Sequence, residues 1–102
     1  MSLPAPYIKF QERFPELAKD FEALGRKCRD TGPLAGREAR LVKLGMAVAT
    51  GSRGGIKSQA RKALHDGLTP DELRHAALLA LPTIGFPAMV AAMGWIDETL
   101  EE

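Results

Sequence analysis

The chain has 102 residues, 45% of them hydrophobic, and this length suits one domain but not two. Its 14 basic and 13 acidic residues give a net charge of +1, which argues against a nucleic-acid surface because such a surface needs a basic excess on one face. No apolar run approaches the roughly 18 residues of a membrane span, so we expect no membrane partner. The single cysteine, Cys28, cannot form an intramolecular disulfide, which favours a reducing compartment, the cytoplasm.

The N-terminal third of the chain contains a helical pattern of apolar residues. Its members recur at alternating spacings of four and three: Phe10, Phe14, Leu17, Phe21, Leu24 and Cys28. This spacing predicts one apolar stripe on a helix. Because Pro15 suits a first helical turn, we expect this helix over about residues 14–29, preceded by an N-terminal arm over residues 1–12. On such a stripe, Cys28 is interpreted as a buried small hydrophobe.

Two further helices are predicted over about residues 37–50 and 53–66, with Gly67 as the C-terminal stop of the second. The inward-facing residues expected in the first are Leu41, Leu44, Gly45 and Val48. Those expected in the second are Ile56, Ala60, Ala63 and Leu64.

The segment from Ala47 to Gln59 joins these two helices and contains Gly51, Gly54 and Gly55. Glycines allow a ligand or another backbone to come close. The segment has no cysteine, histidine or carboxylate, so the usual reactive side chains are missing from it.

The C-terminal third contains the clearest local signal. Thr69 followed by Pro70 and by Glu72 is typical of a capping box with proline at the first helical position. It predicts a helix over about residues 70–81, and a last helix follows over about residues 87–100. No stretch alternates with period two, so we expect an all-α fold, a single-domain bundle of about five helices over residues 1–102. The consecutive apolar residues 76–81 predict a helix that needs a second neighbour, such as another subunit.

Several short motifs then occur in a characteristic order. They are Gly32-Pro33-Leu34 followed by Arg40-Leu41-Val42, Ala63 four residues before Gly67-Leu68-Thr69, the pair Glu72-Leu73, and Gly85-Phe86-Pro87-Ala88. With this order and spacing, the chain resembles the carboxymuconolactone decarboxylase family, which includes the alkylhydroperoxidase D-like proteins. The resemblance implies an all-helical subunit that forms homotrimers or homohexamers, with an active site near the start of the helix over 53–66.

The peroxidase-like branch of that family carries two cysteines, separated by two residues, at this helix N-terminus. A histidine follows four residues after the second cysteine, and a glutamate lies on the preceding helix. By the resemblance, the cysteine positions fall on Ser52 and Gly55, the histidine position on Gln59, and the glutamate position on Arg40, or on Glu38 if the alignment slips by two residues. All four depart from the redox pattern, so we expect no thiol peroxidase chemistry. If the protein is an enzyme, the resemblance implies an activity of the decarboxylase or lactone-processing type.

The two histidines are interpreted as structural. His65 falls at a predicted helix C-terminus, where it meets the helix dipole favourably. His75 falls on the polar side of the helix over 70–81. Neither has a second ligand at metal-binding spacing, so we expect neither a metal nor a cofactor.

Two functions therefore remain open. The expected N-cap Ser52, the free N–H groups after it, and the cations Arg53, Lys57 and Arg40 favour a pocket for a small anionic metabolite, with Gln59 pointing into the same space. The alternative is a catalytically silent oligomeric scaffold or accessory protein, in which the glycines serve close helix packing.

Overall fold

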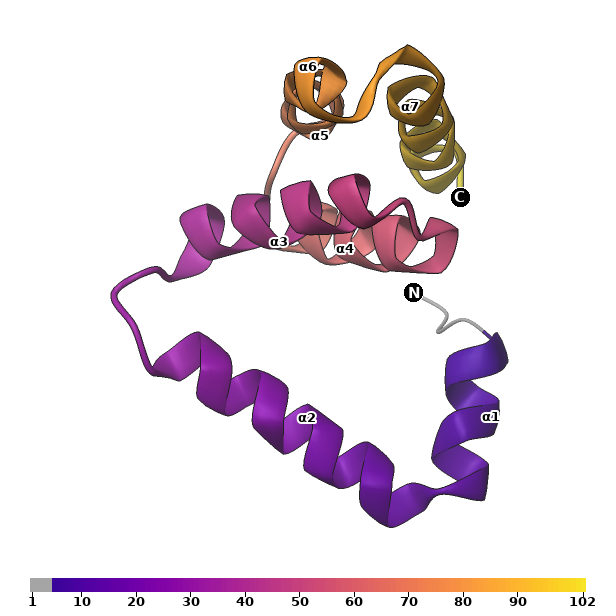
Figure 1. The fold of residues 1–102 in the computed structure, drawn as a ribbon. Helices are drawn as coiled ribbons and strands as arrows, with labels where there is room; N and C mark the ends of the chain where they lie inside the picture. Colours follow the sequence, from indigo (N-terminus) through magenta and orange to yellow (C-terminus); the bar gives the residue numbers. More distant parts are fainter. Residues whose placement is uncertain (1–4) are drawn as a thin grey trace. The chain divides into compact units, whose positions relative to one another are not determined.

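The computed structural model describes residues 5–102, and every regular element in this range is a helix (Figure 1). The all-α prediction is therefore confirmed for the described residues. The chain divides into two compact units, one ending at Ala35 and the other spanning Gly36–Glu102. Each unit is described by itself below.

The first unit contains two helices, α1 (Ala5–Arg13) and α2 (Pro15–Asp30). Phe14 separates them with φ −134° and ψ 65°, because a residue that precedes proline is disfavoured in the helical region. The predicted helix over 14–29 thus corresponds to α2. Residues 5–12 of the expected N-terminal arm are helical, whereas its residues 1–4 lie outside the described range.

The apolar stripe of α2 is exposed within this unit. Phe14, Leu17, Phe21 and Leu24 are 50%, 58%, 66% and 57% exposed, and among residues 5–35 only Ala18 is buried. The expectation that Cys28 is buried was wrong: it is exposed along with its stripe. The reason is that α1 is held to a neighbouring side of α2.

Glu22 marks the side of α2 on which α1 is held. The Tyr7 hydroxyl donates to its Oε1 at 2.8 Å, and the Gln11 side-chain amide donates to the same oxygen at 3.2 Å. The Phe10 ring also lies 5.6 Å from that of Phe14, so α1 reaches the start of the stripe but leaves Leu17, Phe21 and Leu24 exposed.

The second unit contains five helices, α3 (Gly36–Thr50), α4 (Arg53–His65), α5 (Pro70–Leu79), α6 (Leu81–Ile84) and α7 (Phe86–Leu100). Helix α3 packs against α4 and α5, and α7 packs against the same two helices. Figure 1 shows α3 and α4 side by side, with α5, α6 and α7 on the other side of the core. None of the helices in the described range has both the length and the hydropathy needed to cross a membrane.

The helix predicted over residues 70–81 is divided in the structure. Helix α5 ends at Leu79, Ala80 caps it, and α6 begins at Leu81. Proline at position 82 has no N–H to continue the α5 ladder, which explains the break. Together with α1, this short helix raises the count above the five helices expected.

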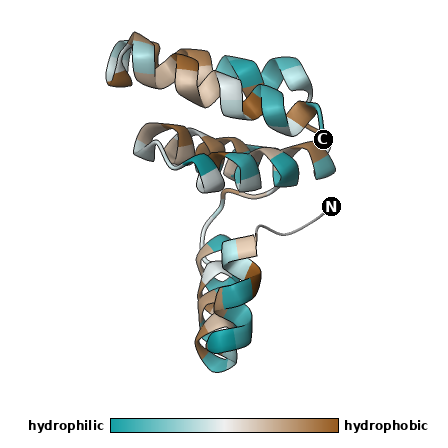
Figure 2. Ribbon diagram, turned by 90° about the vertical axis from the view of Figure 1, so that its right-hand side faces the viewer, coloured by the Kyte–Doolittle hydropathy of each residue, from teal (hydrophilic) through white to brown (hydrophobic). Residues whose placement is uncertain are grey.

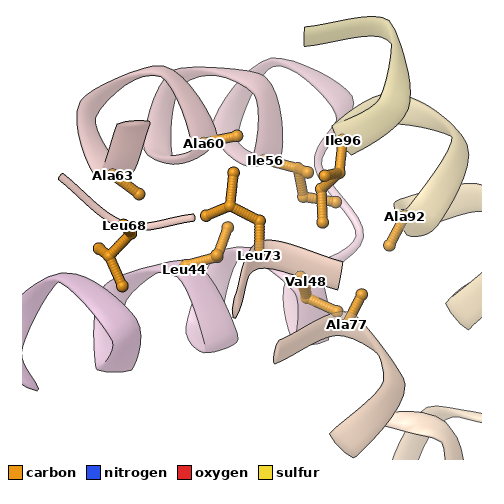
Figure 3. Packing of buried hydrophobic residues seen from close by; sticks show 10 residues of the cluster. All are labelled: Leu44, Val48, Ile56, Ala60, Ala63, Leu68, Leu73, Ala77, Ala92 and Ile96. Carbon is orange, nitrogen blue, oxygen red and sulfur yellow. The ribbon is translucent and has the colours of Figure 1, made fainter. Parts of the chain in front are cut away.

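The core of the second unit contains ten buried hydrophobic residues (Figure 3). They are Leu44, Val48, Ile56, Ala60, Ala63, Leu68, Leu73, Ala77, Ala92 and Ile96. Figure 3 shows Leu73 pointing into the space among Leu44, Ala60 and Leu68, and Ile56 beside Ile96. Most of the inward-facing residues predicted for these helices are in this set. Leu41, Gly45 and Leu64 are only partly buried.

The capping signals are confirmed. The Thr69 hydroxyl accepts a hydrogen bond from the Glu72 N–H at 3.1 Å, and Glu72 Oε1 accepts one from the Thr69 N–H at 2.9 Å. Gly67 has φ 90°, which favours glycine, and the Leu68 N–H donates to the Ala63 carbonyl at 2.9 Å. Both ends of the turn between α4 and α5 are therefore fixed by local chemistry.

Large hydrophobic residues are also exposed on the second unit. Figure 2 shows hydrophobic segments in the helices of both units, and those most exposed in the second unit include Leu79 at 67% and Phe86 at 65%. Single exposed apolar residues are ordinary, but several on one small unit favour a further partner.

We predict that Leu73→Ala lowers the free energy of unfolding by about 2–5 kcal/mol, because it leaves a cavity at a fully buried position. The matched control is Leu78→Ala on the same helix, at a position 48% exposed, which should cost less than about 1 kcal/mol. Urea unfolding followed by circular dichroism measures both. Equal losses would contradict this account of the core.

Candidate functional site

The link between α3 and α4 forms a capped helix start. Gly51 has φ 72°, and Ser52 follows as the N-cap of α4. The Ser52 hydroxyl oxygen accepts a hydrogen bond from the Gly55 N–H at 3.1 Å. The predicted N-cap role of Ser52 is confirmed, and its hydroxyl is engaged by the helix backbone.

Gly55 lies close to this cap. A Cβ placed on Gly55 would be 3.2 Å from Ser52 Oγ, whereas one placed on Gly54 would meet nothing within 4 Å. A 3.2 Å contact is tighter than ordinary packing. Because glycine has no Cβ, the Ser52 side chain can lie against the helix at position 55.

Arg40 and Gln59 are brought together. Arg40 Nη1 donates to Gln59 Oε1 at 3.2 Å, and Arg40 Nε donates to Asp66 Oδ2 at 3.0 Å. The Arg40 side chain is 13% exposed, and its hydrogen bond is the main reason that the pKa of Asp66 lies below its usual value. Glu38, the alternative position, is exposed in the first turn of α3.

The other cations of the predicted site are paired with α7. Arg53 Nη2 and Lys57 Nζ contact Glu98 Oε2 at 3.0 and 3.1 Å. The hydrogen bond from Lys57 is the largest cause of the lowered pKa of Glu98. These positive charges are therefore balanced by an acidic partner on α7.

A second ion pair involves Glu102, which follows the last residue of α7, Leu100. Arg61 contacts Glu102 through two hydrogen bonds, at 2.7 and 2.6 Å, and they lower the pKa of Glu102 to about 2. One side of α4 is thus covered by ion pairs along its length.

The candidate residues form two groups rather than one. Ser52, Arg53 and Gly55 lie at the start of α4, whereas Gln59, with Arg40, lies about 6–10 Å further along the helix axis, at about 1.5 Å per residue. The structure joins Arg40 to Gln59, and none of the side-chain hydrogen bonds among the described residues links these two to Ser52 or Arg53.

A separate pocket of about 450 Å³ lies between α3, α5 and α6. Its lining is mostly apolar and consists of Leu41, Gly45, Ala49, Glu72, His75, Ala76, Leu79, Ala80, Thr83 and Ile84. Ala49, one of the lining residues, is near the end of α3 and belongs to the segment from Ala47 to Gln59. Pockets for small molecules commonly have this size and this mixture of apolar walls with a few polar groups.

The polar lining residues Glu72, His75 and Thr83 were missed by the sequence analysis. Glu72 is anchored by the Thr69 backbone N–H, which is the main cause of its lowered pKa, and it also pairs with Arg37. His75 follows one turn later on α5, so their spacing of three was the available signal. Within the described residues, no three histidine, cysteine, aspartate or glutamate side chains are grouped to hold a metal ion.

The fold is thus an all-helical unit with a capped glycine-rich helix start and an adjoining apolar pocket. The model of the carboxymuconolactone decarboxylase family matches residues 15–98. Because this match covers most of the chain, the chain belongs to the carboxymuconolactone decarboxylase family. No curated protein matches the chain.

We predict opposite results for the two glycines at the start of α4. Gly54→Ala should stabilise the protein by up to about 1 kcal/mol, because alanine favours the helix and its Cβ meets open space. Gly55→Ala should lose this gain, because its Cβ would press on Ser52 and loosen a cap that is worth about 1 kcal/mol. Urea unfolding compares the variants. An equal gain from both would show that the approach of Ser52 is unimportant.

Proposed function

We propose that this family member binds a small carboxylate or other anionic metabolite with a largely apolar body, in the pocket between α3, α5 and α6. The observation that carries this proposal is the pocket itself, about 450 Å³ in volume and lined mainly by apolar side chains. Such a volume suits a single- or double-ring acid or lactone.

The polar groups of the pocket support an oriented ligand. Leu41 and Leu79 would contact the apolar body, while the His75 imidazole and the Thr83 hydroxyl would donate to an oxygen of the ligand. Glu72 is paired with Arg37 and bonded to Thr69, so its charge is balanced. Glu72 would therefore repel a ligand carboxylate bound at His75 less strongly than it would if Glu72 were unpaired.

The Arg40–Gln59 pair is a second part of the same proposal. Arg40 is nearly buried, and its guanidinium has five N–H donors, which its bonds to Asp66 and Gln59 do not exhaust. An anion could bind there in the place where the redox branch holds its glutamate and histidine. The start of α4 has fewer free groups for an anion, because Ser52 caps the helix beside Gly55 and Arg53 is paired with Glu98.

We further propose that the protein has no thiol peroxidase chemistry of its own. The sequence contains one cysteine, and Cys28 lies on α2, whereas the family's thiol positions correspond to Ser52 and Gly55. A serine hydroxyl and a glycine cannot exchange electrons with a peroxide. If catalysis occurs, acid–base chemistry of the decarboxylase or lactone-processing type remains, with His75 and Glu72 as the side chains in the pocket that suit it.

A silent scaffold is the second candidate. The observation in its favour is the ion pairing of Arg53, Lys57 and Arg61 with Glu98 and Glu102, which leaves these cations engaged in structure. Such a protein would assemble with copies of itself, as a homotrimer or homohexamer. Its single cysteine supports a reducing compartment, the cytoplasm, in either case.

The two candidates are separated by a thermal-shift screen with aromatic and lactone carboxylates. A ligand at 100 times its Kd should add about 2.7 kcal/mol, which raises Tm by several degrees. His75→Ala should abolish the shift, and His65→Ala, on an exposed histidine at the end of α4, should keep it. Gln59→Ala tests the second part of the proposal. A panel that never shifts Tm in the native protein would favour the scaffold.

Dithiol-dependent peroxide consumption should be absent. Because the proposal excludes thiol chemistry at the family position, the native protein and Cys28→Ser should both match the buffer rate. A peroxidase assay with dihydrolipoamide or dithiothreitol as the reductant measures this. Turnover by the native protein that Cys28→Ser abolishes would refute the exclusion, since Cys28 is the single thiol of the sequence.

A further inference from the structure

The apolar stripe formed by Phe14 and by Leu17, Phe21 and Leu24 of α2 is contacted in the first unit only at its start, where the Phe14 and Phe10 rings lie 5.6 Å apart. Each of these side chains is at least half exposed, and Ala18 is the one buried residue among residues 5–35. A helix of this length is marginal in water without tertiary packing, which normally covers its apolar face. The stripe therefore requires a partner from outside the unit.

The spacing of the stripe identifies the kind of partner. Residues 14, 17, 21, 24 and 28 follow steps of three and four, the pattern of the a and d positions in a coiled-coil seam. The stripe covers two such heptads. A seam of this kind packs against another helix with the same pattern, and α2 of a second copy has it by identity.

Charges beside the stripe fix the direction of pairing. Asp20 and Lys27 directly precede Phe21 and Cys28, so both occupy g positions on the same edge of the stripe. Neither side chain forms an ion pair among residues 5–102. In a parallel pair, Asp20 would lie beside the partner's Gly25, which offers no charge. In an antiparallel pair, g positions meet g positions, and Asp20 lies beside the partner's Lys27.

We propose that the α2 stripe is a self-association surface, on which α2 of a second copy packs antiparallel. Phe21 then faces the partner's Leu24, and Leu17 faces the partner's Cys28. The contact is isologous, because the same patch serves both copies. It has a twofold axis, so assemblies that use it contain an even number of copies. The proposal does not depend on the pocket or its ligand.

Cys28 provides a direct test of the register. In the proposed pair, Leu17→Cys places a new thiol opposite the partner's Cys28, and mild oxidation should give a covalent dimer on a non-reducing gel. The two thiols within one copy are eleven residues apart, about 16 Å along the helix, so they cannot bond to each other. Lys19→Cys, on the opposite face of α2, is the matched control and should not cross-link. The native protein should not cross-link either, because its two Cys28 residues are also about 16 Å apart.

Two results would overturn the proposal. One is the absence of a cross-link in Leu17→Cys when sizing shows the variant still assembled, which would place another surface against the stripe. The other is a strong cross-link of the native protein through Cys28 alone, which would indicate a parallel pair.

A charge exchange provides an independent test. Asp20→Lys should raise the dissociation constant about tenfold, because two symmetry-related pairs become like-charged. Lys27→Asp should act similarly, and the double variant Asp20→Lys with Lys27→Asp should restore association. Sedimentation equilibrium measures the constants, and circular dichroism checks that each variant keeps its helices. Failure of the double variant to recover would contradict the antiparallel arrangement.

Discussion

Close packing of helices through alanine is the constraint on which the second unit depends. Four of its ten core residues are alanines, at positions 60, 63, 77 and 92, and each is at most 1% exposed. With no long side chain at these contacts, the helices approach one another, and a few larger residues such as Leu73 fill the space between them. Any larger side chain at these alanines would separate α4, α5 and α7 and disturb the elements that frame the pocket.

The same use of small residues creates the pocket. Gly45 and Ala49 on α3 face Ala76 and Ala80 at α5, and their short side chains leave space where leucines would have closed it. Polar groups reach this space because α5 begins with a capping box that anchors Glu72 and sets the phase of the helix. His75 then follows one turn later on the same side. Core packing thus leaves the space of the pocket, and helix capping places its polar side chains.

Local features could be predicted from the sequence, and distant contacts could not. The caps at Ser52 and Thr69 involve hydrogen bonds between residues three apart, so the local sequence is enough to predict them. Arg40 and Gln59 are 19 residues apart, and the pocket draws on three helices, so only the folded chain brings them together. Periodicity placed the apolar residues of α2 on one stripe correctly. It did not reveal that α1 is held mainly beside the stripe, because the hydrogen bonds from Tyr7 and Gln11 to Glu22 join residues 15 and 11 positions apart.

The tight contact at Ser52 has a consequence for redesign. A Cβ on Gly55 would lie 3.3 Å from Ser52 Cβ. Disulfides span Cβ separations of about 3.5–4.5 Å, so the backbone here is only a few tenths of an ångström from accepting a bridge between these positions. The helix start thus holds these two Cβ positions at nearly the separation that a disulfide requires. Two substitutions, Ser52→Cys and Gly55→Cys, would place sulfur atoms at these positions and would exchange a hydrogen-bonded cap for a reducible covalent bond.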